Sequence, residues 1–479
     1  MANSLNRCII SSLHRGFGGG PRAVAAAALM ATLFAAAFAH AAGNILENAP
    51  KGVSAWCVDP CGPNPLLADD NGSAALSGGL DAVAAGNSVA TLSLVVKSAA
   101  PVAAFSISCD SLTCDGKAIP ASAVDILLVK RWYQDGNAWF TEFRDPAGRI
   151  IVPELLLHDD TLVMVDDKSR ANLVRAGGKT VSAEEAATVD ADASALRPFA
   201  LRAGEAQQLI VRIAVAAGTA PGIYRGHIAF SADTAPAGRA PITLRVLAYD
   251  LPRPTARFSD AEYVFLSPHD WPALGEGIAS PFKRIDSRLL ADAGYVVGEK
   301  EDLALAASKK YHVFKSPANQ RQLQARRSIG AIALEAAPPI AGLENPAPWR
   351  RKKGVKAWIA GYGGILIDSI AETDKPWREN HGGTRSRTLL YPTAGGGAIR
   401  TLASMAVEEA WCDICYMSYV NREARRLLAS SDSKVIVEGR RALAWIADVG
   451  AANQAPDTVR LDAIAWIERL RLLSEGGTR

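Results

Sequence analysis

The chain has 479 residues, of which 49% are hydrophobic and 21% charged, and its formal net charge is +3. At roughly 150 residues per domain this length predicts about three domains, and the composition is that of a chain that buries ordinary hydrophobic cores. The small net charge gives no electrostatic reason to expect nucleic acid or an anionic membrane as a partner. We interpret the one concentrated basic run, 350–353, as the solvated start of a helix, with a phosphate-binding patch as the less favoured alternative.

The N-terminal region has the pattern of an export signal. Several arginines precede an Ala-rich apolar run over residues 23–38, and Ala39-His40-Ala41 follows as a small-residue cleavage pattern. This predicts a signal peptide over 1–41 and a secreted or periplasmic protein, with an uncleaved anchor as the alternative. The remaining sequence has no second long apolar run, so we expect no membrane span after cleavage.

Cleavage after residue 41 would remove Cys8 and leave six of the seven cysteines. An even number in an exported protein favours disulfides, although six cysteines allow 15 pairings. Three local bridges are the simplest arrangement. Zinc binding, a redox role for the last pair and burial as reduced small hydrophobes are the alternatives. The three close pairs are Cys57/Cys61, Cys109/Cys114 and Cys412/Cys415.

Residues 42–254 have the periodicity of an antiparallel all-β unit. Short alternating runs such as 90–96 are typical of strands at hairpin spacing. The clearest signal lies in 196–254, where three strands of period two are separated by predicted turns at 218–222 and 236–241. These patterns predict a β-sheet region that fills the first half of the mature chain.

Clustered acids within this region raise the question of a metal site. Asp159-Asp160 and Asp166-Asp167 flank the apolar run 162–165, but their spacing is not that of an EF-hand loop. Acidic residues are common in the turns that end strands. We therefore interpret these four residues as turn residues and expect no metal.

After Pro254 the pattern changes to alternating strands and helices, with helices expected around 282–293, 301–310, 319–327 and 350–360. Such alternation predicts a mostly parallel sheet covered by helices. About 135 residues separate Pro254 from Leu390, whereas a complete (β/α)8 barrel takes roughly 250. We therefore expect four or five βα units in a shortened barrel-like domain over residues 255–398.

The last segment, 399–479, is predicted to be helical. A long helix over 399–428 is apolar on two faces, which favours a position between two packed layers. A second helix is expected to stop at Gly450, and a third to begin at the N-cap candidate Asp457.

Several motifs give the chain a family resemblance. A Gly-x-x-x-Trp-x-x-Gly helix, a Tyr-Pro turn followed by Thr-Leu, and a helix with Glu…Asp-x-x-Tyr resemble glycoside hydrolase family 123 and its relatives of unknown function. Upstream, a Trp-Tyr-Gln strand and a Pro-Glu-Leu-Leu-Leu strand match as well, so the resemblance covers most of the chain after about Val124. The residues that carry it are Gly354, Trp358, Gly361, Tyr391, Pro392, Thr401, Leu402, Glu409, Asp413, Tyr416, Trp132, Tyr133, Gln134, Pro153, Glu154, Asp159, Asp160 and Asp166.

The resemblance implies a fold and an activity. It implies an N-terminal antiparallel β-sandwich, a (β/α) barrel and removal of terminal N-acetylgalactosamine with help from the substrate's own acetamido group. In that family an adjacent Asp-Glu pair orients the acetamido group and protonates the leaving oxygen. One carboxylate must stay ionised while its neighbour stays protonated. This sequence contains no Asp-Glu dipeptide.

Acids at predicted strand ends are the remaining catalytic candidates, because α/β active sites are normally built there. Glu335 and Asp368 each follow an apolar strand, and we interpret them as the acid pair of a hydrolase. Glu344 and three tryptophans predicted in loops are candidates for substrate binding, because an aromatic plane suits the C–H face of a sugar. The alternatives are helix caps or ion pairs for the acids and core packing for the tryptophans. The tryptophans are Trp271, Trp349 and Trp377.

The sequence thus supports two functional hypotheses. The first is an exported protein that acts on glycans, with N-acetyl-hexosaminide hydrolysis as the reaction. The second is a non-catalytic glycan-binding or envelope structural protein derived from the same family. Both expect a carbohydrate or glycoconjugate as the partner. No cofactor is expected, because no P-loop, dinucleotide fingerprint, G-x-S-x-G or H-E-x-x-H motif occurs.

Overall fold

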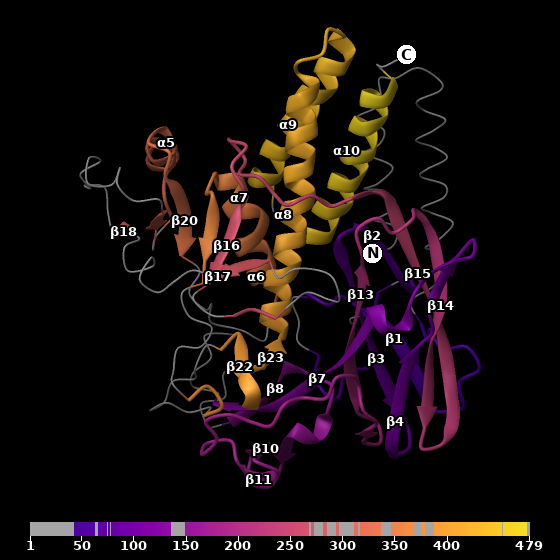
Figure 1. The fold of residues 1–479 in the computed structure, drawn as a ribbon. Coiled ribbons are helices and arrows are strands. Elements are labelled where there is room, and N and C mark those ends of the chain that lie inside the picture. The colour runs from indigo at the N-terminus through magenta and orange to yellow at the C-terminus, as the bar shows by residue number, and fades with distance from the viewer. Residues whose placement is uncertain are drawn as a thin grey trace.

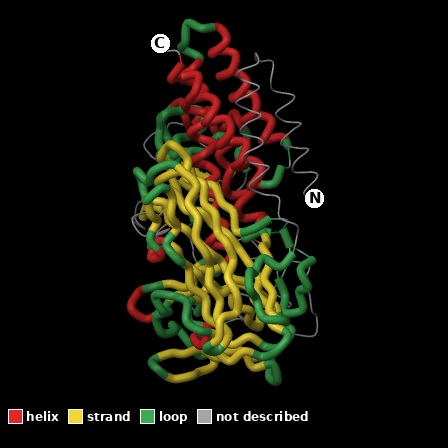
Figure 2. Tube along the Cα trace, turned by 90° about the vertical axis from the view of Figure 1, so that its right-hand side faces the viewer, coloured by secondary structure: helices red, strands yellow, loops and turns green. Residues whose placement is uncertain are grey.

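The computed structural model shows a chain built mostly from strands in several sheets, followed by long helices at its C-terminal end (Figure 1; Figure 2). The signal segment predicted for 1–41, the acids Glu344 and Asp368, and the helix expected over 301–310 lie outside the residues that the structure describes. Those residues are 43–62, 66–73, 75–76, 78–135, 149–267, 270–272, 281–284, 294–296, 311–314, 317–336, 346–367, 375–378, 388–452 and 454–476.

The first large sheet has seven strands in the order β1-β3-β13-β7-β8-β23-β22, all paired antiparallel. Two of its members, β22 and β23, come from the segment just before the C-terminal helices. Ile399, expected at the start of the long helix, therefore lies in a strand. The bounds are β1 (Val53–Val58), β3 (Ser88–Ser98), β7 (Val124–Asp135), β8 (Arg149–Leu157), β13 (Ala206–Val215), β22 (Leu390–Pro392) and β23 (Ala398–Thr401).

The second large sheet follows the order β12-β4-β14-β15-β2, with β5 and β6 attached beside β14. All of its pairs are antiparallel except β15 with β2. Its bounds are β2 (Leu80–Gly86), β4 (Val102–Cys109), β5 (Leu112–Cys114), β6 (Lys117–Ile119), β12 (Phe199–Leu201), β14 (Gly222–Ala232) and β15 (Ala235–Asp250), and the short helix η1 (Ala121–Ala123) leads into β7.

One hydrophobic core joins the inner faces of these two sheets. Leu94 and Leu209 from the first sheet meet Phe105, Phe230 and Leu244 from the second, and none of the five side chains is more than 2% exposed. Because side chains alternate between the faces of a strand, period-two segments can supply this core from one face and a second core from the other.

The hairpin between β14 and β15 differs from its prediction. The turn expected at 236–241 lies inside β15, and the chain instead reverses at Asp233 and Thr234, where Asp233 has a φ of 55°. The Asp233 side chain accepts hydrogen bonds from the backbone N–H groups of Ala103 and Ala104 at 3.0 Å. The turn prediction for 236–241 is therefore wrong: aspartate also forms turns, and here the turn lies just before the Pro- and Gly-containing segment.

A small three-stranded sheet, in the order β11-β10-β9, follows β8. The acids flagged as metal candidates lie at its turns: Asp159 caps a short helix by accepting from Thr161 N, and Asp166 accepts from Lys168 N. The bounds are η3 (Asp160–Leu162), β9 (Val163–Asp166), β10 (Ala171–Ala176) and β11 (Lys179–Ser182).

Beyond Pro254, six short strands form an entirely parallel sheet in the order β17-β16-β21-β20-β19-β18, a curled half-barrel. The predicted parallel sheet is therefore present, and helices lie between β19 and β20 and between β20 and β21. β17 occupies the first residues of the helix expected over 282–293, and the rest of that expected helix lies outside the described residues. The bounds are β16 (Val264–Ser267), β17 (Phe282–Arg284), β18 (Gly294–Val296), β19 (Tyr311–Phe314), α5 (Gln320–Ser328), β20 (Ile332–Ala336), α6 (Pro346–Arg351), the π-helical η4 (Lys352–Lys356), α7 (Ala357–Ala360) and β21 (Gly364–Leu366).

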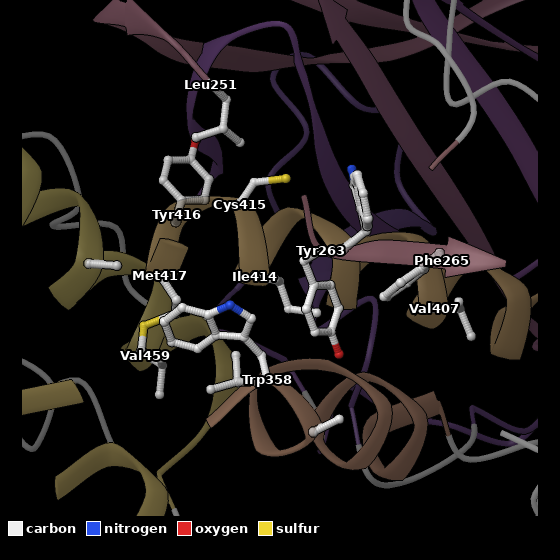
Figure 3. Close-up of a cluster of buried hydrophobic side chains, with 14 of the residues drawn as sticks. Leu251, Tyr263, Phe265, Trp358, Val407, Ile414, Cys415, Tyr416, Met417 and Val459 are labelled. Carbon is white, nitrogen blue, oxygen red and sulfur yellow. The ribbon is translucent and has the colours of Figure 1, made fainter. Parts of the chain in front are cut away.

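Helix α8 (Leu402–Leu427) lies between the first large sheet and the parallel sheet (Figure 1). It begins with a capping box, in which Thr401 and Ser404 satisfy each other's backbone N–H groups. Every residue from 402 to 421 is buried. The predicted position between two layers is thus confirmed, and Figure 3 shows Ile414 and Met417 of α8 beside Trp358 of α7.

Two more helices pack against α8. The first of them, α9 (Ser433–Ala451), ends one residue beyond the stop predicted at Gly450. The other, α10 (Pro456–Gly476), contains the predicted N-cap residue Asp457 in its first turn. No helix in the described part of the chain is long and apolar enough to cross a membrane. The short turn η5 (Ala394–Gly396) lies between β22 and β23.

Candidate functional site

The structure describes one member of the predicted acid pair, Glu335. It lies in β20, and its Oε1 accepts a hydrogen bond from Nζ of Lys353 in η4 at 3.2 Å. Its Oε2 is buried and has no hydrogen-bond partner. Burial raises the pKa of Glu335, against the opposing charge of Lys353. A carboxyl that keeps its proton more readily than usual has the property that a general acid needs.

The face of the sheet on which Glu335 lies argues for a structural role. It is level with Phe314 of β19 and Ile365 of β21, and both belong to the core beneath the helices. The opposite face carries a separate cluster that includes Leu334 and Leu366. Glu335 therefore points toward the helix layer, where Lys353 neutralises it.

A second unpartnered group lies on the same face. Tyr263 is fully buried just before β16, and its hydroxyl has no hydrogen-bond partner. Burial raises the pKa of Tyr263, and the charge of Glu335 raises it further. Figure 3 shows this ring among Phe265, Ile414 and Trp358. Glu335 Oε2 and the Tyr263 hydroxyl are thus two buried oxygens without a hydrogen-bond partner on a mainly apolar face of the parallel sheet.

The three tryptophans considered for sugar stacking are all buried. Trp349 is part of α6 and is 0% exposed, as is Trp377, whose indole N–H donates to Pro392 O at 2.8 Å. Trp271 is 7% exposed and stacks on Phe282 with ring centroids 4.3 Å apart. These placements favour the core-packing interpretation over exposed sugar platforms.

Trp377 belongs to an aromatic group around a buried carboxylate that the sequence reasoning did not single out as functional. Glu154 of β8 is 0% exposed. Its Oε2 accepts from Trp132 Nε1 at 2.8 Å and from Gln134 Nε2 at 3.3 Å, and its Oε1 accepts from the Tyr391 hydroxyl at 3.3 Å. The family-resemblance residues of β7, β8 and β22 thus meet around one carboxylate and join the strands.

A larger polar cluster lies under the first turns of α8. We call it the Glu408 cluster. Glu408 accepts hydrogen bonds from Arg212 Nη2 at 2.7 Å and from Trp271 Nε1 at 3.2 Å, and it forms an ion pair with Arg400, whose Nε lies 3.4 Å away. Glu408 and Arg212 are 3% and 4% exposed at their side chains. The cluster joins α8, β13, β23 and the segment after β16. No local pattern reveals it, because the partners are far apart in the sequence.

Next to this cluster, His158 lies between two carboxylates. Its Nε2 is 2.7 Å from Asp125 Oδ1 and its Nδ1 is 3.4 Å from Asp192 Oδ2. Burial opposes protonation, but these two carboxylates raise the pKa of His158 to about 9. The pKa of Asp125 is lowered by His158, Arg212 and Arg400 in spite of burial. At neutral pH the group is an ion pair, so His158 lacks the near-neutral pKa of an effective general base.

A second buried ionic network links α8 to α6 and α10. Arg350 donates two hydrogen bonds to Asp413, from Nε to Oδ2 at 2.8 Å and from Nη2 to Oδ1 at 3.1 Å. Its Nη1 forms an ion pair with Oδ1 of Asp457 at 2.7 Å. Arg460 binds Asp413 at 2.6 Å and Glu409 at 2.7 Å. Arg350, expected at the solvated start of a helix, is thus 2% exposed, because Asp413 and Asp457 neutralise it.

The predicted disulfides are absent: all six described cysteines are free thiols. Cys57 packs into the core between the large sheets, whereas Cys61 belongs to the core around α8. The turn between them is held by Asp59, whose side chain accepts from Cys61 N at 2.8 Å. Burial raises the pKa of Cys57 to about 12, as expected for an inert thiol.

The other two pairs are also separated or buried by the fold. Cys109 lies opposite Ile228 of β14, and Cys114 follows Thr113, which lies opposite Arg225 of the same strand. At about 3.3 Å per residue the two cysteines are roughly 13 Å apart along one edge, too far for a bridge. Cys412 and Cys415 are buried on α8 as reduced side chains, one of the alternatives considered above.

Two further features of the described residues bear on ligand binding. No group of three or more His, Cys, Asp or Glu side chains among them is arranged to hold a metal ion. A cavity of about 610 Å³ opens beside β6 and the turn between β13 and β14. It is lined mainly by small residues together with Tyr224 and Lys117, and no member of the Glu408 cluster contributes to it.

Comparison with solved structures shows a shared fold. The structure is similar to that of a family 123 glycoside hydrolase from Clostridium perfringens, studied for glycolipid glycan hydrolysis, with a TM-score of 0.58 and 10% identity over 89% of this chain and 100% of that chain. AvmM, a macrocyclization enzyme of alchivemycin A biosynthesis, covers 41% of this chain with a TM-score of 0.20, which is too low to indicate a shared fold. No protein-family model and no curated protein matches the sequence.

Proposed function

We propose that this chain is a glycoside-hydrolase-123-like protein that acts on glycans. The observation that carries the proposal is the likeness of fold to the family 123 enzyme, which extends over the whole of that chain. The motifs quoted above are independent support, because they were identified from the sequence. The finer description of the architecture, a β-sandwich over 42–254 and a shortened barrel over 255–398, belongs to the same proposal.

The reaction proposed is hydrolysis of a terminal N-acetyl-hexosaminide, with Glu335 and Asp368 as the acid pair. The raised pKa of Glu335 and its unpartnered Oε2 support the role of proton donor. Glu344 and Trp271 remain the candidates for substrate contact. Trp349 and Trp377 are less suited to it, because their side chains are fully buried.

A second candidate, glycan binding without hydrolysis, is favoured by one observation. Glu335 forms an ion pair with Lys353 on the helix-covered face of the sheet, where a substrate would have to displace core side chains. A carboxylate in such a pair typically stabilises the fold and does not transfer protons.

Turnover of an aryl N-acetyl-β-galactosaminide by the wild-type chain, Glu335→Gln and Asp368→Asn separates the two candidates. If Glu335 is the general acid, its replacement lowers kcat by about 100-fold or more, because positioned acids contribute factors of that order. Glu423→Gln is the matched control, since Glu423 is also partly buried and ion-paired but lies on α8.

The outcomes are distinct. Wild-type turnover that disappears in Glu335→Gln and persists in Glu423→Gln supports hydrolysis by the proposed pair. Saturable binding of N-acetyl-hexosaminide oligosaccharides with no turnover in any variant supports the second candidate. A wild-type chain that neither hydrolyses nor binds such glycans overturns both.

Export to the periplasm or the medium is the last part of the proposal. It is supported by the sequence pattern over 1–41. N-terminal sequencing of the protein from cell fractions tests it. The expected mature protein begins at Ala42, whereas an intact N-terminus in the membrane fraction would indicate the anchor alternative.

A further inference from the structure

Two arginines from different segments lie over an exposed aromatic ring beside the end of α7, and a third binds the backbone next to that ring. Phe258 is 43% exposed. The guanidinium carbons of Arg257 and Arg327 each lie 4.8 Å from the centre of its ring. Arg425 of α8 donates to the carbonyl of Arg257, to which Asn421 also donates at 3.0 Å. We call Arg257, Phe258, Arg327 and Arg425 the Phe258 patch.

The guanidinium groups of the Phe258 patch bind carbonyls and not carboxylates. Arg257 Nη1 donates to Ile359 O at 2.5 Å, and Arg327 Nη1 donates to Gly361 O at 3.0 Å. Among the residues that the structure describes, none of the three arginines forms an ion pair. Asp260, the acid nearest in sequence, makes no such contact, and Glu262 pairs with Lys283 and Arg253.

The positive charge of the patch is therefore only partly balanced. Ile359 and Gly361 are at the end of α7, and the C-terminus of a helix supplies roughly half a negative charge. Three guanidiniums keep their charge at any physiological pH. Burial lowers the pKa of Arg257 and of Arg327, and the neighbouring charge of Arg425 adds to the effect at Arg257. Half-buried cations without a counter-ion are costly, and a bound anion would remove that cost.

The guanidiniums are also held in place. Each is anchored by a carbonyl, and two are further fixed against the Phe258 ring, so little side-chain entropy remains to be lost on binding. A planar guanidinium can present paired N–H groups to a carboxylate, sulfate or phosphate. Guanidinium groups held in fixed positions suit a single anionic group better than a diffuse charged surface.

The position of the patch separates it from the proposed catalytic edge. Arg327 lies in the last turn of α5, which leads into β20, and Gly361 precedes β21, so the patch is at the amino ends of these strands. Active sites of α/β sheets are built at the carboxyl ends. The patch is thus at the opposite end of β20 from Glu335, which lies next to the last residue of that strand.

We propose that the Phe258 patch binds the sulfate or carboxylate group of an acidic saccharide, as a second glycan contact remote from the proposed catalytic edge. The choice of a saccharide over another anion carrier rests on the proposed function, whereas the requirement for an anion rests on the arginines alone. The exposed edge of Phe258 would contact the apolar side of the sugar that carries the anionic group.

Binding of heparin hexasaccharide, measured by calorimetry at low salt, tests this inference. Arg327→Gln should weaken binding roughly tenfold or more, since hydrogen bonds to charged groups contribute on that scale. Arg321→Gln is the matched control, because Arg321 is exposed on the same helix and its loss changes the net charge equally. Arg327→Lys keeps the charge but loses the fork, so it should retain the fold and still bind more weakly.

Three comparison ligands complete the experiment: chitohexaose as a neutral saccharide, sodium sulfate alone and phosphatidylglycerol vesicles. Heparin binding that Arg327→Gln weakens and Arg321→Gln leaves unchanged supports the patch, whether or not the aryl glycoside is hydrolysed. Equal losses in both variants would show a net-charge effect and overturn it. Vesicle binding through Arg327 without heparin binding would assign the patch to lipid instead. If chitohexaose binds but no variant affects heparin, the patch fails while glycan binding stands.

Discussion

Helix α8 contacts two layers, and the two contacts differ in chemistry. Toward the first large sheet, α6 and α10 it presents Glu408, Glu409 and Asp413, each paired with an arginine whose side chain is at most 14% exposed. Toward η4 and the parallel sheet it presents Ala410 and Trp411, and Trp411 lies 4.9 Å from Phe265 between ring centroids. The same helix is thus fixed by ion pairs on one side and by close apolar packing on the other.

The difference has consequences for specificity. Apolar contacts depend on shape and volume, so they tolerate conservative exchanges. Buried ion pairs cost desolvation, and each charge there depends on its partner. We therefore expect the charged side to fix the position of α8 along the sheet, and the apolar side to depend on close packing. The predictions below test this division, beginning with the charged side.

The largest effect is expected from Asp413→Asn. Asp413 is fully buried and pairs with the buried Arg350 and the largely buried Arg460, so its loss leaves both guanidiniums short of a counter-charge. We expect the free energy of unfolding, measured in urea, to fall by about 3–5 kcal/mol. Glu47→Gln is the control, because Glu47 pairs with Arg239 where both side chains are about half exposed, and it should cost at most about 1 kcal/mol. Equal effects of the two changes would refute a special role for the charged side.

On the apolar side, Gly354→Ala should cost about 1–3 kcal/mol by overpacking. An added Cβ at Gly354 would lie 2.9 Å from Cβ of Ala410, closer than two carbons pack without adjustment. Ala410→Gly should relieve that contact, although glycine within a helix itself costs about 1 kcal/mol. A double-mutant cycle measures the coupling. Strictly additive effects would mean that η4 can move away from α8, contrary to tight packing on this side.

The sequence allowed one side of α8 to be predicted better than the other. The spacing of apolar residues indicated a helix between two layers, and period-two patterns located β13 and β14. The partners of Glu408 and Asp413 were not foreseen, because Arg212 is 196 positions and Arg350 is 63 positions away in the chain. Local patterns carry no information on such pairings.

The errors share that origin. Ile399 was assigned to the helix by its apolar neighbours, but β23 pairs with β8, far upstream. Cysteines close in the sequence were expected to form bridges, but Cys57 and Cys61 point into different cores. The catalytic role of Glu335 stays a prediction: it rests on the position of Glu335 after an apolar run, and the strand pattern alone does not reveal which face of the sheet the helices cover.

At the rim of the charged side, His158→Gln should cost about 1–2 kcal/mol near pH 6. The pKa of His158 is raised from 6.5 to about 9, so its contribution is complete below pH 6.5 and is lost as the pH rises through 9. Unfolding in urea at several pH values checks this. The difference between wild type and variant should shrink by pH 10, and a difference independent of pH would show that His158 acts through packing alone.

The smallest effect, of opposite sign, is expected on α10. Burial raises the pKa of Asp462 from 3.8 to about 6, although a hydrogen bond from Trp445 opposes the shift. The folded state thus binds more protons than the unfolded state between these values, so stability falls as the pH rises through that window. Asp462→Asn should stabilise the protein by about 1 kcal/mol at pH 8, since the residue is partly exposed, and should change nothing near pH 4. The exposed Asp448→Asn on α9 is the control. If Asp462→Asn destabilises the protein at pH 8, the Asp462 carboxylate has a partner that keeps it ionised. The contact between α9 and α10 would then depend on a charge, like the contacts of Glu408 and Asp413 on α8.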